Sequence, residues 1–171
     1  MATMKQTVGA LTAFSAASNL NSLANGAAKP LGEVDNSSND YPTAKIWMVL
    51  NLSTSTLQVG GAVEIYFMAK IEDRSGDNLD WDDEINADDT NDVSGSMFNL
   101  RLIKTFRADD VMASEDIVWN CNDLSALKDQ DGNIVGDLPP YWTLVVYNKS
   151  GQAFASAGHQ AQYVNVTYQT A

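Results

Sequence analysis

The chain has 171 residues, a formal net charge of −12, 44% hydrophobic residues and 19% charged residues. This length suffices for one domain with a hydrophobic core, and the hydrophobic content excludes a disordered chain. The negative charge would repel nucleic-acid phosphates and anionic lipid head groups, so we expect no nucleic acid and no membrane as a partner.

The start of the chain does not resemble a secretory signal. Lys5 is the only cation in residues 1–17, and polar residues such as Gln6, Thr7 and Ser15 interrupt every apolar stretch. No apolar run approaches the roughly 20 residues that cross a bilayer. We therefore expect a protein that is made in the cytoplasm and has no export machinery of its own.

The first 30 residues are rich in Ala, Ser, Thr and Asn. Their large apolar side chains are spread too thinly to form a core on their own; these are Leu11, Phe14, Leu20 and Leu23. The composition predicts an extended N-terminal arm over residues 1–30 and a folded domain over residues 31–171.

Period-two alternation, which places alternate side chains on opposite faces of a sheet, begins near Thr43. It predicts strands over residues 45–52 and 62–71, joined through a turn at residues 58–61. One face of the first strand would carry Ile46, Met48, Leu50 and Leu52, and one face of the second would carry Val63, Ile65, Phe67, Ala69 and Ile71.

Four further strands follow by the same criterion, over residues 97–106, 117–121, 141–148 and 163–169. The aligned side chains are Phe98, Leu100 and Leu102 in the first of these, Trp142, Leu144 and Val146 in the third, and Val164, Val166 and Tyr168 in the last. In the first of these, Asn99, Arg101 and Ile103 would face the other side, as in a sheet with one solvated face.

Helical turns at residues 109–113 and 122–127 are too short to stand alone. Strands joined by long polar loops, without helical crossovers, predict an all-β fold: an antiparallel β-sandwich, most naturally a jelly roll.

Residues 72–92 hold ten acidic side chains against one cation, Arg74. Asp80, Asp82, Asp83 and Glu84 could supply oxygens to calcium, but the run lacks the order of an EF-hand loop, so a solvated loop is the simpler interpretation. Residues 129–133 contain Asp-Gly between polar residues, which indicates a turn.

No residues form a recognisable catalytic or metal-binding motif. His159 is the only histidine, no nucleophile-elbow motif is present, and no acidic pair stands out among the 22 acids. Cys121 is the only cysteine, so neither a disulfide within the chain nor a thiolate metal site is predicted. We predict a protein that is not an enzyme, with no cofactor and no metal.

Of the four tryptophans, Trp142 is placed in the core by its strand pattern. Trp47 falls on the face opposite Ile46, and Trp81 lies in the acidic run. Trp47 and Trp81 are therefore the candidates for stacking on a sugar ring.

Several segments resemble a family of small virion proteins of tailed bacteriophages. They are residues 22–28, 34–41, 44–50, 61–66, 99–103 and 138–151, whereas residues 77–92 and 119–129 do not share the likeness.

The resemblance implies a β-sandwich displayed in many copies on the virion, as a decoration or cement protein on the outer surface of the capsid. It implies the major capsid protein as partner and a homotrimer as the assembly. On this hypothesis the arm, through Leu11, Phe14, Leu20 and Leu23, would bind neighbouring capsid subunits, and joining several subunits would strengthen the attachment.

Two alternatives remain open at this stage. A tail or fibre component that binds a host receptor or glycan would place Trp47, Trp81 and the loops against the ligand. A glycan hydrolase on a jelly-roll scaffold is disfavoured, because no nucleophile, base or metal cluster stands out.

Overall fold

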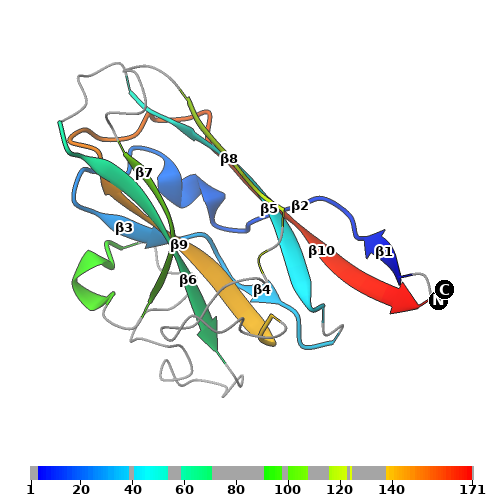
Figure 1. The fold of residues 1–171 in the computed structure, drawn as a ribbon. Coiled ribbons are helices and arrows are strands. Elements are labelled where there is room, and N and C mark those ends of the chain that lie inside the picture. Colours follow the sequence, from blue (N-terminus) through cyan, green and yellow to red (C-terminus); the bar gives the residue numbers. More distant parts are fainter. Residues whose placement is uncertain are drawn as a thin grey trace.

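The computed structural model of the chain describes residues 4–38, 41–53, 59–70, 91–97, 100–107, 116–122, 124 and 138–170. Within these residues the chain forms two antiparallel sheets of five strands each, which pack against each other as a β-sandwich (Figure 1). The described residues also include the short 3-10 helices η1 (Ala17–Leu20) and η3 (Ser94–Ser96). None of the described helices is long and apolar enough to span a membrane. The predicted all-β sandwich is confirmed, and the jelly-roll connectivity stays a prediction.

The first sheet is built from both ends and the middle of the chain. Its strands run in the order β1-β10-β5-β8, with β2 also paired to β10. The strands are β1 (Met4–Val8), β2 (Thr12–Ala13), β5 (Thr43–Asn51), β8 (Asp116–Cys121) and β10 (Gln160–Thr170).

The second sheet runs in the order β3-β9-β6-β7, with β4 also paired to β9. The strands are β3 (Ala28–Pro30), β4 (Val34–Asp35), β6 (Ala62–Lys70), β7 (Arg101–Arg107) and β9 (Tyr141–Lys149). The turn expected before β6 is present at residues 59–60, where Gly60 has a φ of 78°, a conformation that favours glycine.

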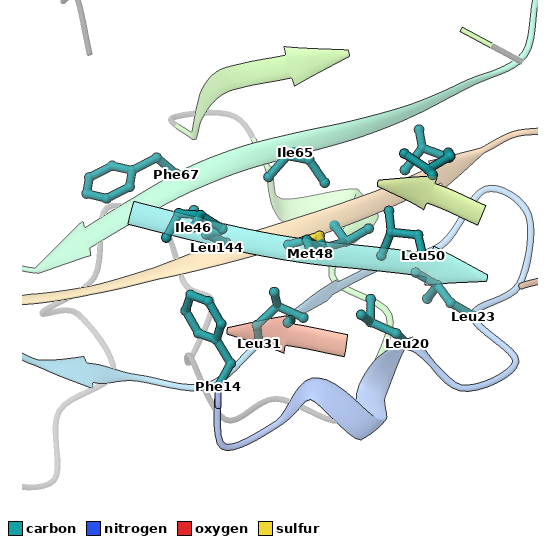
Figure 2. Packing of buried hydrophobic residues seen from close by; sticks show 14 of the residues in the cluster. Phe14, Leu20, Leu23, Leu31, Ile46, Met48, Leu50, Ile65, Phe67 and Leu144 are labelled. Atoms are coloured by element: carbon teal, nitrogen blue, oxygen red, sulfur yellow. The ribbon is translucent and has the colours of Figure 1, made fainter. Parts of the chain in front are cut away.

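The core lies between the two sheets (Figure 2). As predicted, β5 contributes Ile46, Met48 and Leu50 to this core, and Leu52 lies just after the strand. Strand β6 contributes Val63, Ile65 and Phe67. Trp142 of β9 is fully buried among aromatic rings, with ring centroids 5.8 Å from Phe14, 6.1 Å from Phe67 and 5.6 Å from Tyr163. Such edge and offset contacts stabilise a core beyond the area they bury.

A second, smaller cluster lies on the outer face of the second sheet. It consists of Ala28, Met68, Val93, Leu100 and Val145. Val145 is completely buried, as is its neighbour Leu144 on the inner face. Strand β9 is therefore covered on both faces, which explains why it is apolar without a strict alternation.

The prediction of a strand over residues 97–106 is partly wrong. The structure has β7 at Arg101–Arg107, and its register with β6 shifts between Ile65 and Tyr66. Ile103 is the residue without a direct partner at this irregularity, and its side chain packs against the main core. Leu102, which was expected to share a face with buried residues, is 49% exposed. A bulge of this kind changes which side chains face the core, and alternation alone cannot reveal it. Phe98 and Asn99 lie outside the described residues.

The sequence aligns Val164, Val166 and Tyr168 on one face of the last strand, but the opposite face of this strand meets the core. Tyr163 pairs with the buried Ile46 and packs against Trp142, so the odd-numbered residues of β10 face the core. Val164, Val166 and Tyr168 consequently lie on the outer face of the first sheet.

The predicted extended arm is replaced by a segment that belongs to the sandwich. Within residues 4–30, β1 and β2 pair with β10, and β3 pairs with β9. The domain boundary expected at residue 30 falls between β3 and β4. Both of these strands pair with β9, so they belong to the same sheet. The helical turn expected at residues 109–113, most of the one at 122–127, and Ile71 lie outside the described residues.

Candidate functional site

The four residues predicted to bind a partner separate into one exposed and three buried side chains. Leu11 is 59% exposed, whereas Phe14, Leu20 and Leu23 are 3%, 0% and 1% exposed and belong to the main core (Figure 2). The partner-binding assignment of the three buried residues is therefore corrected. Of these four residues, only Leu11 has an exposed side chain.

Backbone hydrogen bonds hold these buried residues in place. The N–H of Phe14 donates to the carbonyl of Ala161 at 3.0 Å, and the N–H of Phe154 donates to the carbonyl of Leu23 at 3.0 Å. The two sheets therefore complete the hydrogen bonds of this segment and bury its apolar side chains.

The outer face of the first sheet is the most distinctive surface in the described part of the chain. The register places on this face the side chains of β5, β8 and β10 that alternate with the core residues; they are Lys45, Trp47, Val49, Asp116, Val118, Asn120, Gln160, Gln162 and Val164. All of them are half-buried or exposed, and Val118 is 56% exposed. Where β10 pairs with the start of β5, Thr43 and Val166 on this face are buried, whereas Tyr168 near the end of β10 is 44% exposed.

This outer face carries almost no charge. Asp116 is the only acidic residue in the five strands of the first sheet, and Lys5 and Lys45 are the only cations. All 22 acidic residues of the chain fall between Glu33 and Asp137, so the terminal segments contribute none. In a chain of net charge −12, this face is one that another acidic surface can approach without strong repulsion.

Trp47 lies on this outer face. It is half-buried, and the register places it between Gln162 of β10 and Asn120 of β8. Trp142 is in the core, as predicted. Trp119 lies on the inner face of the first sheet and packs against Phe106, with ring centroids 6.4 Å apart. Trp81, the other candidate for stacking, lies outside the described residues.

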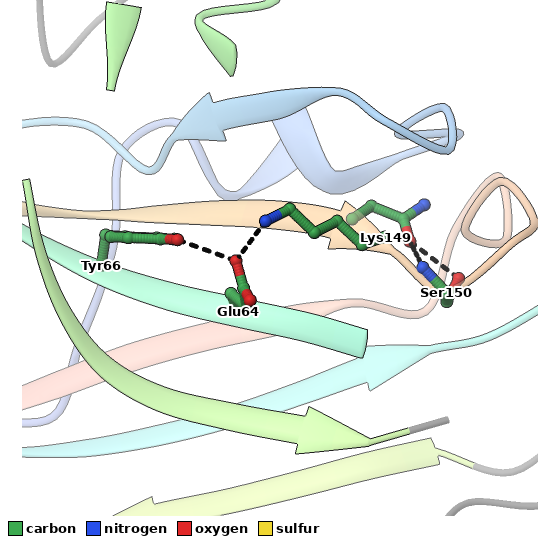
Figure 3. Close-up of polar contacts among 5 residues, drawn as sticks. Glu64, Tyr66, Lys149 and Ser150 are labelled. Atoms are coloured by element: carbon green, nitrogen blue, oxygen red, sulfur yellow. Dashed lines mark hydrogen bonds and ion pairs between the residues drawn. The ribbon is translucent and has the colours of Figure 1, made fainter. Parts of the chain in front are cut away.

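A polar cluster occupies the outer face of the second sheet (Figure 3). Oε2 of Glu64 accepts from the Tyr66 hydroxyl and from Nζ of Lys149, both at 2.8 Å, and Nζ also lies 4.3 Å from the ring centroid of Tyr147. Burial raises the pKa of Tyr66 far above its ordinary value, and the bond to Glu64 adds to the rise. Tyr66 therefore stays protonated and donates to Glu64, so the cluster is an internally satisfied ion pair.

The imidazole of His159 forms hydrogen bonds with two backbone groups. Its Nδ1 accepts from the backbone N–H of Asn51 at 3.1 Å, so Nε2 carries the proton and donates to the carbonyl of Ala155 at 2.9 Å. The imidazole also packs on Phe154, with ring centroids 5.6 Å apart. Both ring nitrogens are engaged by backbone groups, so His159 joins the loop before β10 to the end of β5.

Of the acidic run, the structure describes only Asp92. Its Oδ1 accepts from the backbone N–H of Ala28 and of Ser94, each at 2.9 Å. Burial alone would raise its pKa, but these hydrogen bonds outweigh burial and lower the pKa of Asp92. Asp92 thus fastens the segment that covers the outer face of the second sheet.

Residues 71–90 and the predicted turn at 129–133 lie outside the described residues. Among the side chains that are described, no three His, Cys, Asp or Glu residues come together in a group that could hold a metal ion. Cys121 is half-buried on the inner face of β8, next to the main core.

The sequence pattern did not reveal this outer face with few charges. The even-numbered and the odd-numbered side chains of β10 look equally suited to a core. The signal that was available is the absence of acids from both ends of the chain. Comparison of the chain with family models, curated proteins and solved structures gives no significant match.

Proposed function

We propose that the chain is a structural protein of a tailed-bacteriophage virion, which decorates and stabilises the outer surface of the capsid by binding the major capsid protein. The observation that carries the proposal is the unequal distribution of charge. The outer face of the first sheet holds one acid at its margin, while the chain as a whole has a net charge of −12. A decoration protein needs such a difference between a face that adheres and a remainder that stays solvated.

Contact would be made by the apolar and amide side chains of β5, β8 and β10. Val118 is the most exposed of the large apolar side chains on these three strands, Val49 lies opposite it in the register, and Trp47 lies two residues along from Val49. Leu11, the one exposed residue of the predicted binding set, lies in the connection between β1 and β2 and offers a separate apolar contact. Burying such groups against the shell would supply the hydrophobic part of the binding energy, and each copy adds to the attachment when several are joined.

The role proposed is structural and not catalytic. The only histidine is committed to two backbone groups, and the Glu64 cluster is satisfied by its own neighbours. These arrangements support a rigid body that presents a surface. The resemblance of residues 22–28 and 138–151 to small phage virion proteins supplies the identity of the partner.

The test is co-sedimentation of the purified protein with capsids that lack it. Full-length protein is compared with Val118→Asp, which places a carboxylate on the outer face of the first sheet. Leu102→Asp is the matched control, because Leu102 is similarly exposed but lies on β7 of the second sheet. We expect saturable binding by the wild type and the control, with affinity at least tenfold lower for Val118→Asp.

Failure of the wild type to bind would overturn the capsid proposal. Equal binding by all three proteins would leave the capsid as partner but remove this face as the contact. Circular dichroism of each variant confirms that the sandwich is retained.

A second function, recognition of a host receptor or glycan by a tail component, is favoured by the setting of Trp47. An indole flanked by the amides of Gln162 and Asn120 offers an apolar surface for a sugar ring together with donors and acceptors for its hydroxyls. Binding of the purified protein to a glycan array, abolished by Trp47→Ala, would support this function over the capsid role.

A further inference from the structure

The edge strand β1 and the end of β10 form a ribbon of two strands that extends beyond the sandwich (Figure 1). Pairing between β10 and β5 ends at Val166, which is opposite Thr43, whereas pairing between β10 and β1 continues to Thr170, which is opposite Met4. Residues 5–13 are all exposed. Isolated two-stranded ribbons are marginally stable in water, so this ribbon would gain from a further strand.

The backbone groups of β1 that face away from β10 can be assigned. The N–H of Gly9 donates to the carbonyl of Asn165 at 2.9 Å, and the register from Val8 back to Met4 is regular. Because hydrogen-bonded and non-hydrogen-bonded pairs alternate in an antiparallel ladder, Thr7 and Lys5 also bond to β10. Met4, Gln6 and Val8 therefore direct their N–H and C=O groups towards the side of β1 that pairs with no other strand among the described residues.

We propose that this edge of β1 pairs with β1 of a second copy of the same chain. In an antiparallel pair centred on Gln6, Gln6 lies opposite Gln6 of the second copy and Val8 lies opposite its Met4. Every outward backbone group then meets another, giving about six hydrogen bonds, at two for each directly opposed pair. The two first sheets join into one continuous sheet across a two-fold axis.

The distribution of charge selects a second copy as the occupant. The residues of β1 and β10 include no acid, and Lys5 is their only charged residue. In the proposed register Lys5 lies opposite Thr7 and does not directly face the other Lys5. Two chains of net charge −12 can therefore approach at this edge with far less repulsion than their overall charge implies. The other edge strand of the first sheet, β8, begins with Asp116 and cannot pair with itself so neutrally.

This inference concerns the protein alone and does not depend on the proposed function. It differs from the homotrimer that the resemblance implies, because one edge pairing with itself closes after two chains. Sedimentation velocity of the purified full-length protein over a range of concentrations is expected to show a reversible change from one chain to two. A protein that stays monomeric, or that forms three chains, would overturn the proposal.

A charge-swap experiment tests the register. Gln6→Glu and Gln6→Lys each place like charges opposite one another in the pair, and we expect at least a tenfold loss of self-association for either variant. An equimolar mixture of the two variants should associate again, since opposite charges then meet. Val59→Glu, in the exposed turn before β6, is the control and should dimerise like the wild type.

Amide hydrogen exchange provides a second measurement. The N–H groups of Gln6 and Val8 should become protected as protein concentration rises, while that of Thr7 should be protected at every concentration. Dimerisation without protection at Gln6 and Val8, or a mixture of the two variants that stays monomeric, would refute pairing through β1.

Discussion

Asn148 illustrates how single polar side chains hold separate parts of this fold together. It is fully buried on β9, and its Nδ2 donates to the carbonyls of Leu23 and Gln152 at 2.8 and 2.7 Å. Its Oδ1 accepts from the backbone N–H and the hydroxyl of Ser150 at 3.0 and 2.7 Å (Figure 3). The amide group offers two donor hydrogens and an acceptor oxygen at the end of one neutral side chain, so this position joins the N-terminal segment to the loop after β9.

Asn148→Ala should destabilise the protein by about 3 kcal/mol, because it leaves buried carbonyls and a buried donor without partners. Asn25→Ala is the matched control. Asn25 is exposed and accepts one bond, from the N–H of Gly151, so its replacement should cost less than about 1 kcal/mol. Urea unfolding of both variants measures the difference, and equal losses would contradict the assigned role of Asn148.

At the scale of elements, the second sheet depends on a short segment that covers its outer face. Val93 and Leu100 lie over Met68 and Val145, and Asp92 ties the start of this segment to Ala28 of β3. The two strands next to the cover, β6 and β9, therefore have buried side chains on both faces. The sequence showed β9 as a strand but gave no sign of what covers it.

The lowered pKa of Asp92 makes this attachment sensitive to acid. A carboxyl group with a depressed folded-state pKa contributes stability above its ordinary pKa, and the contribution is lost as pH falls through the folded-state value. We expect the wild type to be more stable than Asp92→Asn at neutral pH, and the difference to vanish under acidic conditions. Urea midpoints of both proteins, measured from neutral to acidic pH, check this, and parallel curves would exclude the assignment.

At the scale of the whole molecule, the N-terminal segment is part of the sandwich. It supplies β1 and β2 to one sheet and β3 to the other, and its side chains fill the core beside Trp142. Removing residues 1–30 would take away three strands and uncover the core. Point substitutions are therefore the better way to probe this segment.

Leu20→Ala and Leu11→Ala make the same chemical change at a fully buried and a largely exposed position. We expect Leu20→Ala to lower the free energy of unfolding by about 2–5 kcal/mol, through lost burial and a cavity. Leu11→Ala should change it by less than about 0.5 kcal/mol. Thermal and urea unfolding measure both variants, and a small effect at Leu20 would restore the interpretation of residues 1–30 as an independent arm.

The sequence by itself determined the all-β class and five strands, β5, β6, β8, β9 and β10, because alternation over several residues is a local signal. It also located Trp142, Ile46 and Met48 in the core. It could not find β1 to β4, which are short and form only where β10 and β9 provide partners.

Tertiary structure alone decided the faces and the surface. Which side of β10 faces inward follows from pairing between Tyr163 and Ile46, and the exposure of Leu102 follows from the irregularity between β6 and β7. The same pairing leaves an outer face with few charges, and a β1 edge that no other described strand pairs with. These features depend on contacts between residues far apart in the sequence, and therefore on the register of one strand against another, which no local pattern specifies.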